Sequence, residues 1–270
     1  MDLHRAKYLL PNSLTMGSAF AGFTSIYLSL NATDAKTFSL AAWLIVIAMF
    51  CDLFDGRVAR MTKTESALGV QLDSLADALS FGIAPAFLMY AWGLESLGIV
   101  GLVPAFVYAA CAILRLARFN VMAAESHGVM RYFLGLPTPL AAGAVVSVVM
   151  AHLAVTHHMT TTAVGSVAIF ATLLGGLMVS NVKYRTFKDV NFRGRAGLGV
   201  LALATVAVGL GAAIKPSVAF VTLMVLYILI GVVGTVVEWS RAILGDDSYY
   251  EGYDEDEILA PSTIEADEDR

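Results

Sequence analysis

Four aspartates are the residues of this sequence with the clearest capacity for chemistry, because they lie inside two adjacent apolar stretches. Asp52 and Asp55 are three residues apart, and Asp73 and Asp77 are four residues apart. On a helix, each of these spacings puts both carboxylates on one face. Ionisable residues at membrane depth are energetically unfavourable and usually mark a functional site. The two pairs therefore predict one site shared by two neighbouring helices.

The distance of each pair from the ends of its stretch predicts a common depth. Asp52 precedes Arg60 by eight residues, and Asp77 follows Val70 by seven. With a helical rise of about 1.5 Å per residue, both aspartates would lie roughly 10 Å from helix ends on the same side. An antiparallel helix pair with a short connection can then bring all four carboxylates together.

Four clustered carboxylates require protonation or a cation, because like charges repel strongly where the dielectric constant is low. Oxygen ligands suit hard divalent ions such as Mg²⁺, Mn²⁺ or Ca²⁺, and we expect two ions of Mg²⁺ or Mn²⁺. Two metals can clamp a diphosphate during a displacement at phosphorus. Gly56 and Gly69 would let a ligand approach the backbone, and Arg60 offers a planar group of donors to a phosphate. The alternative is that the acids only pair with Arg57, Arg60 and Lys63.

The composition indicates that a membrane surrounds the elements that carry these residues. Of 270 residues, 58% are apolar and only 14% are charged, against a usual charged share of about 25%. An ordinary soluble enzyme of this length needs more polar surface. The formal net charge of -5 also excludes a nucleic-acid binder that works by net charge.

Eight stretches are long enough to cross a bilayer, which takes about 20 helical residues. We therefore expect an all-α, polytopic integral membrane protein. Its eight predicted transmembrane helices cover residues 13–31, 38–60, 70–93, 97–118, 137–156, 162–181, 197–214 and 217–238.

The distribution of Lys and Arg predicts the orientation of these helices. With the N-terminus inside, fifteen basic residues lie on the inner side and only Lys36 and Lys215 on the outer side. The protein would then lie in the inner membrane, with both termini and the aspartate site on its cytoplasmic side. We expect a membrane-embedded domain over residues 1–240. Residues 241–270 would form a flexible acidic tail, since eleven acids follow from Asp246 onward.

The aspartates belong to a longer pattern of eight fixed identities within 26 residues. It reads Asp52-Leu-Phe-Asp55-Gly56-Arg-Val-Ala59-Arg60, then eight residues, Gly69, three residues, Asp73, three residues and Asp77. This stretch resembles the D-x2-D-G-x2-A-R-x8-G-x3-D-x3-D motif of the CDP-alcohol phosphotransferase family, with no departure from it.

The resemblance implies a helical membrane fold with a two-metal site open to the cytoplasm. It also implies a CDP-linked donor, a hydroxyl acceptor and release of CMP. The implied metal ligands are Asp52, Asp55, Asp73 and Asp77, and Asp77 is the expected general base. We assign donor binding to Asn12, Thr15, Gly56, Ala59, Arg60 and Gly69.

Four further stretches resemble the membrane-type phosphatidylserine synthases of this family. They are Pro11-Asn12-Ser13-Leu14-Thr15, Arg115-Leu-Ala-Arg118-Phe119-Asn120, Phe133-Leu-Gly-Leu136-Pro137-Thr-Pro139 and Ser180-Asn181-Val182-Lys183-Tyr184. The implied substrates are CDP-diacylglycerol and L-serine. Because arginine can hold a carboxylate through two hydrogen bonds, we assign acceptor binding to Arg115, Arg118, Asn120 and Lys183. A glycerol 3-phosphate or inositol phosphate acceptor would use basic residues in the same way.

Two other functions share some of these features. A cation transporter would need polar residues that continue from the aspartates to the outer side of the membrane. Residues 40–50 and 79–89, however, are apolar except for Ser80. An aspartate-rich prenyltransferase predicts a second acidic cluster, but the last four predicted spans contain no Asp. The phosphatidyltransferase is therefore favoured, with membrane lipid and no nucleic acid as partners. Small residues such as Gly17 and Gly175 suit close helix packing or a homodimer face.

Overall fold

A computed structural model describes residues 3–62, 64, 66–125 and 132–185, and the side chains of 11–62, 64, 66–123 and 135–182. Its α-helices are α1 (Leu3–Asn31), α2 (Ala35–Thr62), α3 (Ala67–Asp77), α4 (Ala84–Met89), α5 (Leu102–Glu125), α6 (Thr138–Thr156) and α7 (Val164–Val179). Tighter or wider turns connect α3, α4 and α5: η1 (Ala78–Ile83), η2 (Tyr90–Leu94) and η3 (Glu95–Gly101). The spans predicted at 197–214 and 217–238, and the tail, lie outside these residues.

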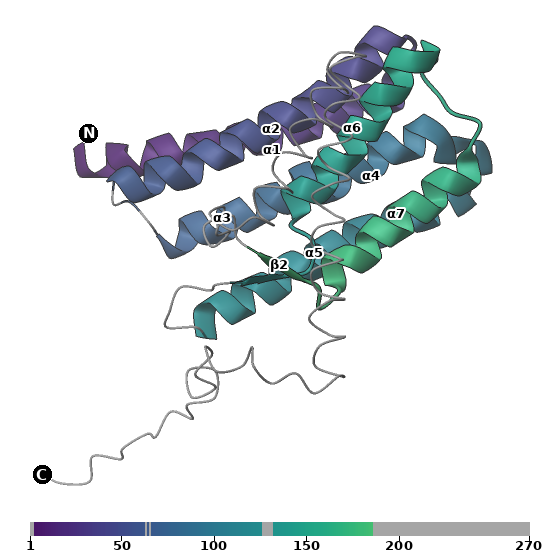
Figure 1. Cartoon of the computed structure of the whole chain (residues 1–270). Helices are drawn as coiled ribbons and strands as arrows, with labels where there is room; N and C mark the ends of the chain where they lie inside the picture. Colours follow the sequence, from purple (N-terminus) through teal and green to yellow (C-terminus); the bar gives the residue numbers. More distant parts are fainter. Residues whose placement is uncertain (1–2, 63, 65, 126–131, 186–270) are drawn as a thin grey trace, which may run out of the picture. The chain divides into compact units, whose positions relative to one another are not determined.

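Helices α1 and α2 lie side by side as an antiparallel pair (Figure 1). Asp34 caps the start of α2, where its carboxylate accepts a hydrogen bond from the backbone N–H of Thr37 at 2.7 Å. Such a cap satisfies one of the free donors at a helix end. The hydroxyl and the N–H of Thr37 hold the pKa of Asp34 below its ordinary value. Farther along, the Ser25 hydroxyl donates to the carbonyl of Ala41 at 2.8 Å, which links the two helices.

One helical path leads from the aspartate motif into α5, with a single reversal. Ser66 caps the start of α3, since its hydroxyl accepts a hydrogen bond from the N–H of Gly69 at 3.0 Å. The reversal falls at Gly98, whose φ of 57° and ψ of -133° suit a residue without a Cβ. Beyond Gly98, α5 returns along η1 and α4. The spans predicted at 70–93 and 97–118 are thus the two arms of this path.

The turn that follows the motif, η1, is π-helical and is held by helices on two sides. The Ser80 hydroxyl donates to the carbonyl of Ser18 in α1 at 2.9 Å. A Cβ at Gly22 would lie 2.8 Å from Cα of Ser80, so this approach of α1 depends on glycine. From α5, the buried hydroxyl of Tyr108 donates to the carbonyl of Phe81 at 3.1 Å. Single π-turns are frequent near functional sites, and this one fixes the helix directly after the aspartates.

The described residues agree with the all-α prediction, and two of the predicted loops pair as short strands. β1 (Tyr132–Leu134) and β2 (Lys183–Arg185) run antiparallel. The chain leaves β1 through Gly135, which has a φ of 78° and whose added Cβ would lie 2.1 Å from the carbonyl oxygen of Met178. The pairing satisfies backbone donors and acceptors that the loops would otherwise leave without partners. It also brings the start of α6 beside the end of α7.

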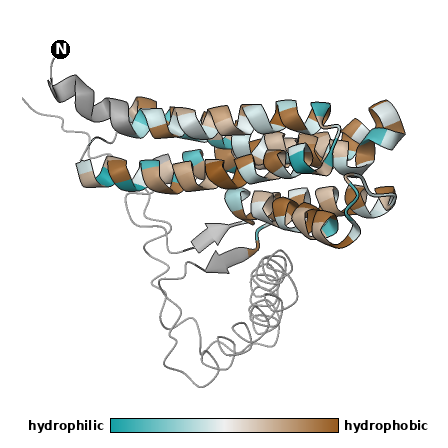
Figure 2. Ribbon diagram, turned by 90° about the horizontal axis from the view of Figure 1, so that it is seen from above, coloured by the Kyte–Doolittle hydropathy of each residue, from teal (hydrophilic) through white to brown (hydrophobic). Residues whose placement is uncertain are grey.

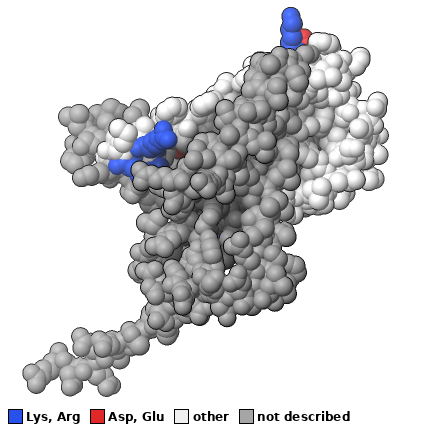
Figure 3. Space-filling view, viewed as in Figure 1, with Lys and Arg blue, Asp and Glu red and all other residues white. Residues whose placement is uncertain are grey.

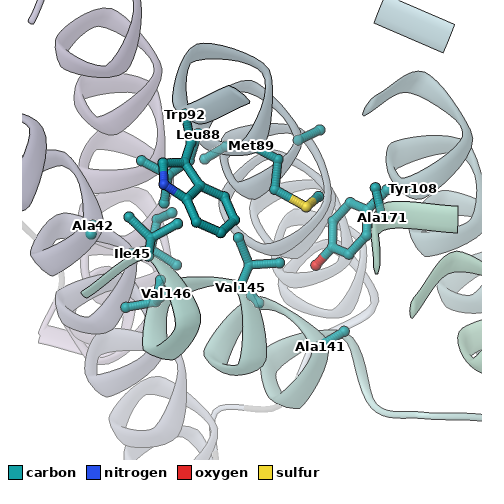
Figure 4. Close-up of a cluster of buried hydrophobic side chains, with 14 of the residues drawn as sticks. Ala42, Ile45, Leu88, Met89, Trp92, Tyr108, Ala141, Val145, Val146 and Ala171 are labelled. Atoms are coloured by element: carbon teal, nitrogen blue, oxygen red, sulfur yellow. The ribbon is translucent and has the colours of Figure 1, made fainter. Parts of the chain in front are cut away.

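The buried core lies where α2, α4, α5, α6 and α7 meet. Figure 4 shows the ring of Trp92 among Ile45, Val145 and Val146, with Met89 and Tyr108 farther to the right. Many other core positions are alanine, and such small residues let helices approach closely within a membrane.

Three described segments are long and apolar enough to cross a membrane: Ala35–Thr62, Ala67–Ala123 and Thr138–Thr156. The helix α7 is apolar but shorter. Hydrophobic residues run along most of each described helix (Figure 2). Many of the large ones are exposed; the side chain of Phe20, for example, is 71% exposed. Outward-facing apolar surface of this extent is rare on soluble monomers. The helical, membrane-spanning character is thus supported, while eight spans and their orientation stay predictions.

Charged side chains are few on the described surface. Figure 3 shows Lys and Arg in two separate places on one face. Lys36 lies at the start of α2, whereas Arg57 and Arg60 lie near its other end, beyond the aspartates. Basic residues thus lie at both ends of α2, and the orientation expected from the preference of such residues for the cytoplasmic side stays a prediction.

Candidate active site

Helices α2 and α3 bring three aspartates of the motif into one group. Carboxylate oxygens of Asp52, Asp55 and Asp73 lie within 4.8 Å of one another. Asp55 is 4% exposed, and the other two are partly buried. Three oxygens at this spacing are a ligand set that Mg²⁺ or Mn²⁺ takes in proteins. The residues present therefore fit a divalent cation.

The fourth aspartate of the motif joins this group through one of its members. The carboxyl groups of Asp77 and Asp52 share a hydrogen bond. Asp77 lies one helical turn beyond Asp73, at the end of α3, and is not part of the group of three oxygens. The structure thus brings all four aspartates into one site and gives Asp77 a separate place in it.

Thr15 of α1 forms a hydrogen bond with the carboxylate of Asp55. The hydroxyl of Thr15 donates to Oδ2 of Asp55 at 2.7 Å, and the carbonyl oxygen of Pro11 lies 3.1 Å from the same hydroxyl. Both Thr15 and Asp55 are buried. Thr15 was predicted to bind the donor, and in the structure its hydroxyl contacts a carboxylate of the site.

The other residues assigned to the donor lie where α1, α2 and α3 approach the site. A Cβ added at Gly69 would be 3.7 Å from Oδ1 of Asn12, so α1 also reaches the start of α3. A Cβ at Gly56 would meet no atom within 4 Å. The exposed Arg60 donates from Nε to the carbonyl of Gly56 at 3.0 Å, and the carbonyl of Ala59 accepts a backbone bond that ends α2. The open side at Gly56 and the guanidinium beside it leave space for a phosphate group.

Two of the residues assigned to the acceptor make contacts within the bundle. Asn120 donates from Nδ2 to the hydroxyl of Ser74 at 2.8 Å, and Ser74 directly follows Asp73. Arg115 is buried and donates to the hydroxyl of Thr138 at the start of α6 at 3.1 Å. Asn120 is thereby connected to the helix that carries two of the aspartates.

The remaining two lie toward the end of α7. Arg118 donates to the side-chain oxygen of Asn181 at 2.9 Å and to the carbonyl of Val179, the last residue of α7, at 3.4 Å. A guanidinium at this place also stabilises the negative end of the helix dipole. Lys183 begins β2, and its side chain lies outside the described residues.

Several hydroxyl residues of the site escaped the sequence interpretation. Ser74 stands within the motif between Asp73 and Asp77, and a polar residue inside an apolar helix is itself a signal. Ser66 could have been found as a helix cap, because it stands three residues before Gly69 at the start of an apolar run. Thr138 gives no signal of its own, because only the fold brings Arg115 to it.

Known proteins share long stretches of this sequence. Residues 8–178 match the family described as CDP-alcohol phosphatidyltransferase. The chain is similar to CDP-diacylglycerol–serine O-phosphatidyltransferase of Helicobacter pylori, with 34% identity over 226 residues, 84% of this chain and 90% of that protein. The Bacillus subtilis protein of the same name is 33% identical over 181 residues, 66% of this chain and 91% of its own. That of Mycobacterium leprae is 40% identical over 141 residues, 51% and 45% of the two chains.

The matched region contains the complete aspartate motif and every described membrane-spanning candidate. Together, the family match and the long apolar helices identify an integral membrane protein.

Proposed function

Since the chain belongs to the CDP-alcohol phosphatidyltransferase family, we propose that it transfers the phosphatidyl group of CDP-diacylglycerol to the hydroxyl of L-serine. The products are phosphatidylserine and CMP. The observation that carries the proposal is the group of carboxylate oxygens from Asp52, Asp55 and Asp73 within 4.8 Å of one another. The names of the relatives support serine as the acceptor.

The reaction exchanges one phosphorus–oxygen bond for another. The serine hydroxyl oxygen attacks the β-phosphorus of the donor, the bond from that phosphorus to the bridging oxygen breaks, and CMP leaves with the oxygen. A carboxylate oxygen of Asp77 accepts the hydroxyl proton as the new bond forms. Two divalent cations, Mg²⁺ or Mn²⁺, held by the four aspartates, would neutralise the charge on the diphosphate and on the leaving group.

The other residues of the site bind and orient the substrates. Arg60, beside the open position at Gly56, would hold a phosphate of the donor, with Asn12, Ala59 and Gly69 shaping the same side. Arg118 and Asn120 would orient serine, supported by Arg115 and Lys183. The excess of basic residues near the motif supports a site that faces the cytoplasm. A homodimer, packed through faces rich in small residues, belongs to the same proposal.

The purified full-length protein should release CMP from CDP-diacylglycerol only when serine and a divalent cation are both present. The reason is that four carboxylates beside a diphosphate would repel it without a metal. Release of CMP is measured with L-serine, glycerol 3-phosphate, inositol phosphate and choline in parallel, with Mn²⁺, Mg²⁺ or excess EDTA. Faster turnover with glycerol 3-phosphate or inositol phosphate than with serine would identify that alcohol as the acceptor and reject serine. Full activity in EDTA would contradict the metal site itself.

Replacing Arg118 by alanine should raise the KM for serine by about 10- to 100-fold, the loss expected for a hydrogen bond to a charged group. The KM for CDP-diacylglycerol should change little. Asn181→Ala is the matched control, because it removes the partner that Arg118 contacts near the end of α7 without removing the guanidinium. If both variants raise the KM for serine equally, Arg118 acts by holding that segment and does not bind the acceptor.

A further inference from the structure

We propose that Thr15 is a positioning residue, which holds the carboxylate of Asp55 in the orientation that a divalent cation requires. The inference rests on the proposed function, because it concerns the same carboxylate site. It gives Thr15 a role different from contact with the donor.

The hydrogen bond itself is short and shielded from solvent. The Thr15 hydroxyl lies 2.7 Å from Oδ2 of Asp55, a residue 40 positions away in the sequence. The two side chains are 6% and 4% exposed. A hydrogen bond from a hydroxyl to a carboxylate is stronger than one between two neutral groups. Where the dielectric constant is low, such a hydrogen bond is stronger still. The contact therefore restrains one oxygen of Asp55, and the backbone N–H of Gly56 also donates to this carboxylate.

The position of the hydroxyl is fixed by the packing of α1. Thr15, Ser18 and Gly22 lie at helical spacing on one buried face of α1. Ser18 and Gly22 both lie against Ser80 in the π-turn after the motif. The contact between α1 and η1 therefore also fixes the position of Thr15 relative to α2. The threonine side chain adds stiffness, since its branched Cβ restricts χ1.

A partner of this kind has a known effect on metal sites. Side chains that hydrogen-bond a metal ligand orient it, and their loss typically lowers metal affinity or activity about 10- to 100-fold. Valine has the shape of threonine but no hydroxyl, so Thr15→Val would leave Asp55 without its side-chain partner and with only the backbone N–H of Gly56. Thr15→Ser keeps the donor.

The test measures binding of Mn²⁺ alone to the purified full-length protein, by electron paramagnetic resonance of free Mn²⁺, without substrates. Thr15→Val should bind Mn²⁺ at least about 10-fold more weakly than the wild type, and Thr15→Ser should restore binding. Thr24→Val is the matched control on the same helix, because the Thr24 hydroxyl donates to the carbonyl of Phe20 at 2.8 Å, four residues back, and to no carboxylate. It should bind Mn²⁺ like the wild type.

A second comparison shows whether the effect passes through Asp55. In the Asp55→Asn background, Thr15→Val should cause no further loss of Mn²⁺ binding, since non-additivity marks residues that act as one unit. Unchanged Mn²⁺ affinity in Thr15→Val, with a raised KM for CDP-diacylglycerol, would overturn the inference and make Thr15 a donor contact. The binding measurement needs neither donor nor acceptor. A wild type that binds Mn²⁺ but releases no CMP would therefore reject the proposed function and leave this inference standing.

Discussion

Asparagine in place of Asp73 is expected to abolish serine-dependent release of CMP, with kcat/KM lowered by more than about 100-fold. Loss of a partner of a metal ligand already costs up to about 100-fold, and here a ligand itself would lose its charge. Asparagine keeps the shape of aspartate, so the fold should survive the change. The same result is expected for Asp52→Asn and Asp55→Asn, because the three carboxylates form one group.

The measurement compares turnover and Mn²⁺ binding of each variant with the wild type across a wide range of metal concentrations. Asp34→Asn is the matched control, because Asp34 is an exposed aspartate at the far end of α2. It should retain wild-type turnover. A variant of the group that keeps a near wild-type rate at saturating metal would remove that residue from the set of ligands.

Asp77→Asn is expected to lower kcat by about 10²- to 10⁴-fold, the usual contribution of a general base, and to leave donor binding intact. The structure places the Asp77 carboxyl beside Asp52 but outside the group of three oxygens. We therefore expect it to accept the proton of the substrate hydroxyl while the other three aspartates stay in place. Pre-steady-state turnover and metal-dependent binding of CDP-diacylglycerol separate the two effects.

Two other outcomes of the Asp77 experiment have clear meanings. If the variant loses binding of both the donor and Mn²⁺, the main role of Asp77 is that of a metal ligand and not that of a general base. If kcat hardly changes, no carboxylate of Asp77 takes the proton, and the serine hydroxyl is activated by other means. Asp77→Glu refines the test, since it keeps the carboxylate but shifts it by one methylene.

The spacing of the motif was enough to predict a shared carboxylate site. Residues three or four apart face one side of any helix, so Asp52 with Asp55 and Asp73 with Asp77 are set by local geometry alone. The long apolar runs likewise indicated helices, because a helix satisfies its backbone hydrogen bonds within its own segment when it crosses a membrane. Both inferences depend only on residues that are close together in the chain, and their spacing can be taken from the sequence.

The contacts of α1 could not be read in this way. Its buried face carries Thr15, Ser18, Gly22, Ser25 and Ser29, while large side chains such as Phe20 point outward. In water the hydrophobic face of a helix is the buried one, but lipid removes that preference and close packing favours small residues. The apolar pattern therefore did not indicate which face of α1 meets the motif.

The amino-acid sequence by itself determined the helices, the pairing of the aspartates along each helix and the kind of ligand that four carboxylates can hold. Only the tertiary structure decided that Thr15 restrains Asp55, that Ser74 is the partner of Asn120, and that a π-turn follows Asp77. It also decided that Arg118 reaches the end of α7 and that two loops pair as strands. The physical reason is that these bonds join residues far apart in the chain. Their partners are chosen by helix packing and by the need to satisfy buried polar groups.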